Sequence, residues 1–140
     1  MVAYDRLYLE DSITLAEQLF YAVSKENKWD FEKFTEGFMK CMYRQLWDTG
    51  SPRIINMTYD ELIEYLQVRC SDIFVEGECL IDPLLAEWIG GMYTRVQYYS
   101  AKSSEEIYKK LPLMKMVELF KPLHTVDEDI ATEKLLNWLK

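Results

Sequence analysis

Residues 82–100, DPLLAEWIGGMYTRVQYYS, predict one long helix and decide the fold class. Asp82 can cap the start of this helix, and Pro83 suits its first position because the N–H that proline lacks has no acceptor there. The apolar and aromatic residues cover more of the helix than one surface stripe requires: Leu84, Leu85, Trp88, Ile89, Met92, Tyr93, Val96 and Tyr99. We therefore expect a central helix with neighbours on most sides.

Two adjacent glycines, Gly90 and Gly91, stand in the middle of this helix. Each glycine costs about 1 kcal/mol relative to alanine inside a helix. Their presence therefore predicts that another backbone or a ligand comes close at this turn. We favour a second helix as the neighbour, and keep a ligand pocket as the alternative.

Start and stop signals divide the remaining chain into further helices. Before the central helix we expect three helices: one at residues 4–25, one from Asp30 to about Asp48 that is ended by Gly50 and Pro52, and one opened by Thr58 with Glu61. After it we expect three short helices. Ser103 with Glu106 opens the first, Pro112 opens the second and Pro122 closes it, and Thr125 with Glu128 opens the third. No stretch alternates convincingly between apolar and polar residues as a strand would. The sequence therefore predicts an all-α fold, with residues 1–140 forming a single domain, a compact bundle of six to seven helices around residues 82–100.

The charge of the chain narrows the classes of partner. The formal net charge of the 140 residues is −8, whereas sequence-independent binding to nucleic acid needs a basic surface. Residues 1–100 carry the excess, with 9 Lys and Arg against 17 Asp and Glu, and residues 101–140 are balanced. A patch of lysines between Lys109 and Lys121 is the only support for a DNA-binding helix-turn-helix. A basic protein partner agrees better with the charge.

The cysteines and the single histidine give no metal site. Cys41, Cys70 and Cys79 lack the C-x-x-C spacing of a zinc or redox centre, and His124 is the only imidazole. We expect buried free thiols in a reducing compartment, no metal and no cofactor. The N-terminus lacks the features of a signal peptide and no segment has the length and apolarity of a membrane span. A cytoplasmic location is therefore expected.

Catalytic signatures such as a nucleophile elbow, a phosphate-binding loop or a zinc-protease motif do not occur in the sequence. We interpret His124, in the turn before Thr125, as a structural residue that bridges two helix ends. The sequence thus predicts a protein that is not an enzyme. The alternative is a small ligand-binding or enzymatic bundle with a pocket near Gly90 and Gly91 and with His124 as the base.

Tyrosine is frequent, with ten residues in the chain, and four of them lie between residues 93 and 108. Tyrosine combines a large apolar area with a polar tip, which suits both helix packing and partner interfaces. Tyr98 and Tyr99 point to different sides of their helix. We place Tyr99 in the core and expect Tyr98 to be the surface contact.

The last 50 residues carry an ordered set of motifs: Gly91, Tyr93, Gln97-Tyr98-Tyr99, Ser103-Ser104-Glu105-Glu106-Ile107-Tyr108-Lys109, Leu111-Pro112, Leu123-His124-Thr125 and Asp129-Ile130-Ala131. This order resembles a group of small uncharacterised all-helical bacterial proteins, mostly from Firmicutes. Members of that group are similar to the companions encoded beside toxin genes, and some of those toxins resemble mono-ADP-ribosyltransferases. The first 80 residues carry no such resemblance. The resemblance implies an antitoxin or accessory subunit.

Carried over to this chain, the motif positions of the resemblance are Tyr93, Tyr98, Ser104, Ile107, Tyr108, Lys109, Pro112, His124 and Thr125. Together with the charge, they predict a non-catalytic interaction module that neutralises a basic protein partner. Aromatic anchors would set its affinity and net charge its association rate. The residues expected to bind the partner are Tyr93, Tyr98, Ser104, Tyr108, Lys109 and His124, with no role for nucleic acid or membrane.

Overall fold

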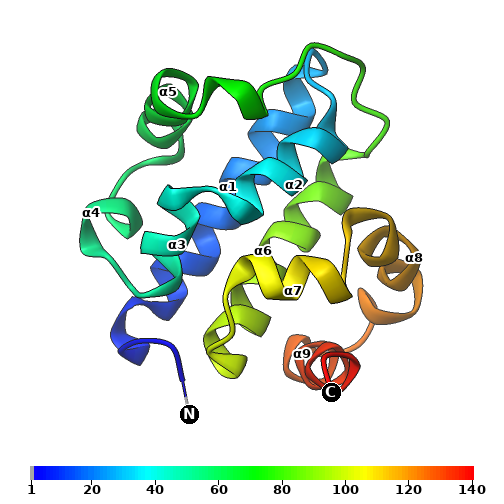
Figure 1. Ribbon diagram of the computed structural model, residues 1–140. Coiled ribbons are helices and arrows are strands. Elements are labelled where there is room, and N and C mark those ends of the chain that lie inside the picture. The colour runs from blue at the N-terminus through cyan, green and yellow to red at the C-terminus, as the bar shows by residue number, and fades with distance from the viewer. Residues whose placement is uncertain (1) are drawn as a thin grey trace.

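The computed structural model describes residues 2–140, which fold into α-helices joined by short connections (Figure 1). The helices of this range are α1 (Leu9–Glu26), α2 (Phe31–Lys40), α3 (Met42–Asp48), α4 (Pro52–Ile55), α5 (Tyr59–Arg69), α6 (Pro83–Ser100), α7 (Ser104–Lys110), α8 (Leu113–Leu123) and α9 (Glu128–Trp138), with 3₁₀ turns η1 (Arg6–Tyr8) and η2 (Ser71–Ile73). Strand-like pairing in these residues is limited to an isolated bridge between Trp29 and Glu76. The all-α prediction is confirmed, but nine helices exceed the expected six or seven.

Helices α1 and α6, of 18 residues each, pack along each other in the middle of the view in Figure 1. A Cβ atom added to Gly90 would lie 2.7 Å from the carbonyl oxygen of Ala16 and 2.8 Å from Cγ of Phe20. These distances are too short for any real side chain, so the glycine allows α1 to approach. The close neighbour predicted at Gly90 is therefore a helix.

The ring of Phe20, on α1, is the meeting point of an aromatic core. It makes edge-to-face contacts with Phe31, Phe34 and Phe38 of α2, at centroid distances of 5.8, 6.0 and 5.8 Å, and with Tyr93 of α6 at 6.4 Å. Each such pair contributes about 0.5–1.5 kcal/mol beyond the burial of apolar area. This cluster fixes α2 against the pair formed by α1 and α6.

Most of the predicted helix starts are confirmed. The carboxylate of Asp82 accepts a hydrogen bond from the N–H of Leu84 at 2.8 Å, and Pro83 is the first residue of α6. Capping boxes open α5 and α7, where a Ser or Thr hydroxyl and a Glu carboxylate three residues later each accept from the other's backbone N–H: Thr58 with Glu61 and Ser103 with Glu106. Local capping chemistry was sufficient to predict these starts.

The expected second helix is divided at Cys41. Cys41 has an extended backbone (φ −73°, ψ 156°), which ends α2, and its Sγ accepts from the N–H of Arg44 at 3.4 Å at the start of α3. After Gly50, where φ is +81°, Pro52 opens the short helix α4, which the sequence did not predict. The break at Cys41 and the additional helix α4 each add one helix to the expected number.

Three further boundaries differ from the prediction. The helix expected over residues 4–25 begins at Leu9, after the turn η1. Pro122 lies in the last turn of α8, which continues to Leu123. Asp127, rather than Thr125, caps α9: its carboxylate accepts from the N–H of Asp129 at 2.8 Å.

Candidate functional site

Two of the tyrosines predicted to bind a partner, Tyr93 and Tyr108, are buried. Tyr93 is fully buried on α6, and its hydroxyl donates to the carbonyl oxygen of Leu111 at 2.7 Å. The ring of Tyr108, on α7, lies 6.2 Å from that of Tyr93 and is 7% exposed. Burial raises the pKa of both phenols. Their contacts join α6 to α7 and to the turn that follows α7.

The exposure predicted for Tyr98 is wrong. Tyr98 is 1% exposed, whereas Tyr99 is only half-buried. The N-terminal segment covers Tyr98: the ring of Tyr4 lies 5.0 Å from it, edge to face, and the N–H of Ala3 donates to its carbonyl oxygen at 2.9 Å. Tyr99 remains near the surface, where its hydroxyl accepts from Arg6 at 3.4 Å. A segment almost 100 residues away in the sequence therefore decides which tyrosine is buried.

Ser104, also predicted to bind a partner, belongs to a buried polar network between α3 and α7. The hydroxyl and the N–H of Ser104 both donate to the carboxylate of Asp48, at 2.7 Å each. The guanidinium of Arg44 donates to Oγ of Ser104 at 2.9 Å, and its Nε lies 3.5 Å from the same carboxylate. Arg44 and Asp48 are only 1% and 7% exposed. Ser104 thus holds α7 against a buried ion pair.

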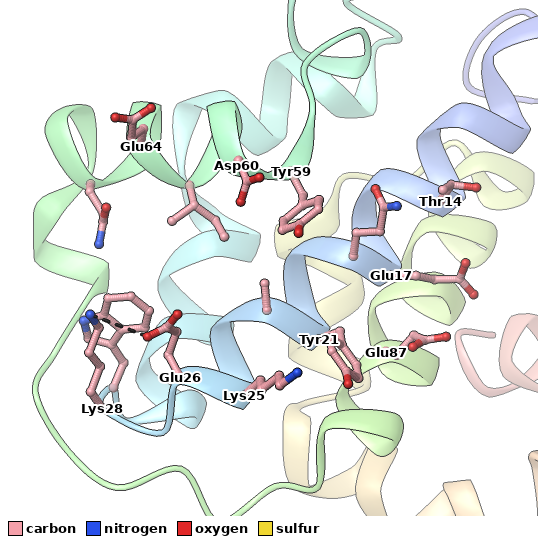
Figure 2. Close-up of a pocket in the computed structure, with 15 residues that line it drawn as sticks. Thr14, Glu17, Tyr21, Lys25, Glu26, Lys28, Tyr59, Asp60, Glu64 and Glu87 are labelled. Carbon is pink, nitrogen blue, oxygen red and sulfur yellow. Dashed lines mark ion pairs between the residues drawn. The ribbon is translucent and has the colours of Figure 1, made fainter.

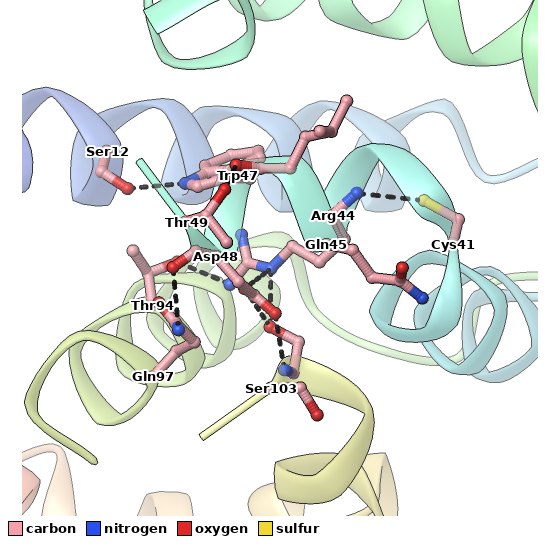
Figure 3. Close-up of polar contacts among 12 residues, drawn as sticks. Ser12, Cys41, Arg44, Gln45, Trp47, Asp48, Thr49, Thr94, Gln97 and Ser103 are labelled. Atoms are coloured by element: carbon pink, nitrogen blue, oxygen red, sulfur yellow. Dashed lines mark hydrogen bonds and ion pairs between the residues drawn. The ribbon is translucent and has the colours of Figure 1, made fainter. Parts of the chain in front are cut away.

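Further polar contacts extend this network to α6 and α1 (Figure 3). Arg44 donates to Thr94 of α6 at 3.1 Å, and its guanidinium lies 4.5 Å from the ring centroid of Trp47. The indole N–H of Trp47 donates to Ser12 of α1 at 2.6 Å. Burial lowers the pKa of Arg44 and raises that of Asp48, while Arg44 opposes the rise. The network connects four helices in the interior.

Lys109 and His124 are exposed, as a partner-binding residue must be. The Nδ1 atom of His124 lies 2.8 Å from the carbonyl oxygen of Phe120 and 3.1 Å from that of Lys121, so this nitrogen donates to the end of α8. The imidazole also stacks on the ring of Phe120 at 4.1 Å. These hydrogen bonds serve one helix end, not the two that the sequence suggested.

A groove of about 1070 Å³ lies between α1 and α5, with the first turns of α6 at one side (Figure 2). We call it the α1–α5 groove. Half-buried apolar and aromatic side chains line it: Tyr21, Ala22, Trp29, Tyr59 and Ile63. His124 does not line this groove, whereas Glu17, the residue that Gly91 faces, does. This groove therefore lies beside α1, with Glu17 facing Gly91, and not beside His124.

The charges of the α1–α5 groove are mostly negative. Five carboxylates line it, those of Glu17, Glu26, Asp60, Glu64 and Glu87, against the two lysines Lys25 and Lys28. The two lysines lie at the end of α1, where Lys28 pairs with Glu26 at 3.7 Å. Within residues 2–140, none of the other four carboxylates has an ion-pair partner. The groove therefore presents unneutralised negative charge beside an aromatic surface.

Glu17 is the most perturbed carboxyl of the groove. Partial burial raises its pKa from 4.5 to about 7, and the negative charges of Glu87, Glu128 and Glu10 add to the rise. Arg95 lowers the pKa, but this guanidinium is hydrogen-bonded to Glu128. Glu17 thus lies close to other negatively charged carboxylates, and an additional positive charge would stabilise its ionised form.

Sequence spacing alone brings only two carboxylates of this groove together. Asp60 and Glu64 stand four residues apart, which places them on one face of α5, where the helix dipole also favours negative charge in the first turn. Glu17 and Glu87 are 70 residues apart, and they meet only because α6 packs against α1. No local signal in the sequence indicates that Glu17 and Glu87 lie close together.

In the part of the chain that the structure describes, we find no cluster of three or more histidine, cysteine or acidic side chains arranged to hold a metal ion. Among the helices of the same residues, none combines the length and the apolarity needed to cross a membrane. The three cysteines are free thiols, but each is half-buried and not fully buried as expected. Comparison of the chain with protein families, with curated proteins and with solved structures gives no match.

Proposed function

We propose that the chain is a non-catalytic interaction module that binds a basic protein partner. One observation carries the proposal: on a chain of net charge −8, a groove with aromatic walls is lined by four carboxylates that have no ion-pair partner within residues 2–140. A complementary positive charge on the partner would be attracted over a distance and would raise the association rate. The aromatic side chains would supply the apolar contact on which affinity depends.

The resemblance of the last 50 residues to companions of toxin genes favours a toxin as the partner, and an antitoxin or accessory subunit as the role. The residues of the motif do not all support a role in partner binding equally. Buried Tyr93, Tyr98 and Ser104 act through the fold, whereas Lys109 and His124 are exposed and available to a partner. The proposal therefore rests on the charge and the groove rather than on the motif.

Affinity capture of the tagged protein from its own cells, followed by native mass spectrometry, tests this function. We expect one basic protein in fixed stoichiometry, released by raised salt because screening weakens charge pairs. Elution of the chain alone, or only as its own oligomer, at low salt would contradict the proposal. A chain of the same length and fold with neutralised groove carboxylates serves as the control for non-specific capture.

The ionisation of Glu17 favours a second candidate, a bundle that binds a small molecule. A carboxyl group with a pKa of about 7 can exchange a proton near neutral pH, and the groove is as large as a small-molecule site. A thermal-shift screen with small organic cations tests this candidate. A thermal shift caused by the cation, measured against each protein without ligand, that is present in the wild type and lost in Glu17→Gln would support it.

A further inference from the structure

The α1–α5 groove carries negative charge on both of its sides. Asp60 and Glu64 project from α5, and Glu17 and Glu87 come from α1 and α6 (Figure 2). Asp60 and Glu64 are exposed, so water now solvates them, whereas Glu17 and Glu87 are half-buried. A ligand that matches this groove therefore needs positive charges along two edges.

The surface that accompanies these carboxylates is apolar. Tyr21, Tyr59 and Ile63 are half-buried, and Tyr59 and Ile63 also pack against the hydrophobic core, which holds them in place. Rigid aromatic side chains lose little conformational entropy when a partner covers them. The matching ligand thus has an apolar stripe as well as two rows of cations.

From this complementarity we infer that the α1–α5 groove seats a basic amphipathic helix of the partner protein, with its apolar stripe on Tyr21, Tyr59 and Ile63. The inference rests on the proposed function and specifies its partner. A groove between two helices accepts a third helix, as in other helix-in-groove complexes. Lysine and arginine beside the stripe extend their aliphatic stems over apolar surface and bring their charges to the edges.

The spacing of the acidic residues on α5 supports a helix over an extended segment. Asp60 and Glu64 are four residues apart, one helical turn, which separates their Cβ atoms by about 5–6 Å. In a partner helix that lies along α5, Lys or Arg residues four positions apart would place their charges at the same interval as Asp60 and Glu64. An extended strand repeats its side chains on one face at about 6.4–6.8 Å, with alternate residues facing away.

Site-specific photo-crosslinking in the protein's own cells tests this inference. The probe p-benzoylphenylalanine is introduced at Gln18 of α1 or Gln67 of α5, which line the groove and are exposed. The same probe at Lys33 or Lys134, both exposed and outside the groove lining, reports on the other surfaces. We expect the groove probes to attach to a partner segment rich in Lys and Arg at helical spacing, and at least tenfold less product from the outer probes.

A pair of matched charge reversals separates the groove from general electrostatics. Asp60→Lys with Glu64→Lys should reduce crosslinking at the groove probes at least tenfold. Asp129→Lys with Glu133→Lys is the control, because these residues have the same types, the same spacing and the same position at the start of an exposed helix face of α9. The control should retain more than half of the product, and circular dichroism should show equal helicity for both variants.

The outcomes distinguish this inference from the function on which it rests. Crosslinks from the outer probes alone, or equal loss in both charge reversals, would overturn the groove inference and leave the interaction module. Groove crosslinks to an acidic or extended segment, to nucleic acid or to a second copy of this chain would also overturn it. Absence of product from all four probes, in cells that express the protein, would contradict the interaction function itself.

Discussion

The buried network around Arg44 and the α1–α5 groove both gather charged side chains from separate helices, but they treat the charges in opposite ways. In the network, Asp48 accepts two hydrogen bonds from Ser104 and lies 3.5 Å from Arg44. In the groove, neither Asp60 nor Glu64 forms an ion pair among the described residues. A buried charge must be compensated within the fold, whereas water solvates an exposed charge, which stays accessible to a partner.

This difference separates residues that hold the structure from residues that are free to bind. Ser104 belongs to the motif that predicted partner contacts, yet it is fully buried and its hydrogen bonds are used inside the chain. Glu17 and Glu87 belong to no motif, yet they line the groove. Burial and pairing, rather than motif membership, therefore indicate where this protein can contact another molecule.

The largest effect should follow loss of the buried cation. Arg44→Met leaves Asp48 without its charge partner, and we expect the free energy of unfolding to fall by about 3–5 kcal/mol. Urea unfolding at pH 7 measures the change. The double variant Arg44→Met with Asp48→Leu should recover part of the loss because no uncompensated charge is left. A loss below about 1 kcal/mol in the single variant would show that the interior tolerates charges as the groove does.

The adjacent glycines of α6 test the boundary between interior and groove. Gly90→Ala would place Cβ 2.7 Å from the backbone oxygen of Ala16, which cannot move alone, so we expect a loss of about 1–3 kcal/mol in the free energy of unfolding. Gly91→Ala is the control, because its Cβ would meet flexible side-chain atoms of Glu17 at 3.0 Å. That variant should be close to neutral. Equal losses would show that both glycines face rigid structure.

A smaller, pH-dependent effect is expected at Glu17. Its pKa is about 7 in the folded chain against 4.5 ordinarily, so the unfolded chain releases this proton first as the pH rises. The stabilisation linked to the protonated form is present below pH 4.5 and is lost as the pH rises through 7. After allowance for partial exposure, the loss from pH 5 to pH 8 is about 1 kcal/mol.

Glu17→Gln should therefore flatten this part of the dependence of the unfolding free energy on pH. Urea unfolding at pH 5 and pH 8 measures it, with Glu133→Gln, an exposed residue on α9, as the control. The same slope in wild type and Glu17→Gln would mean that water solvates this carboxylate as well as those of α5.

The smallest effect is expected where the carboxylates are exposed. Asp60→Asn with Glu64→Gln removes two groove charges that form no ion pair with any residue the structure describes, and we expect the free energy of unfolding to change by less than about 0.5 kcal/mol. Thermal or urea unfolding tests this. A loss of several kcal/mol would assign these residues to the fold, together with the network of Arg44.

Local chemistry explains why some features were predictable from sequence and others were not. The caps Thr58 and Ser103 and the proline that opens α6 act within one helical turn, and the structure confirms them. The break at Cys41 interrupts an apolar pattern that continues on both sides of it, so periodicity did not indicate it. The placement of Tyr98 was wrong for a related reason, because the residues that cover it lie at the other end of the chain.

The amino-acid order determined the all-α class, most of the helix starts and the need for a close neighbour at Gly90, since periodicity, caps and missing side chains act through short-range sterics and hydrogen bonds. Tertiary structure alone decided that Arg44 and Ser104 are buried together and that Glu17 and Glu87 line one groove. These contacts between distant residues depend on which helix faces pack against each other. Many residues across the chain contribute to the free energy of that packing, so a short stretch of sequence does not predict it.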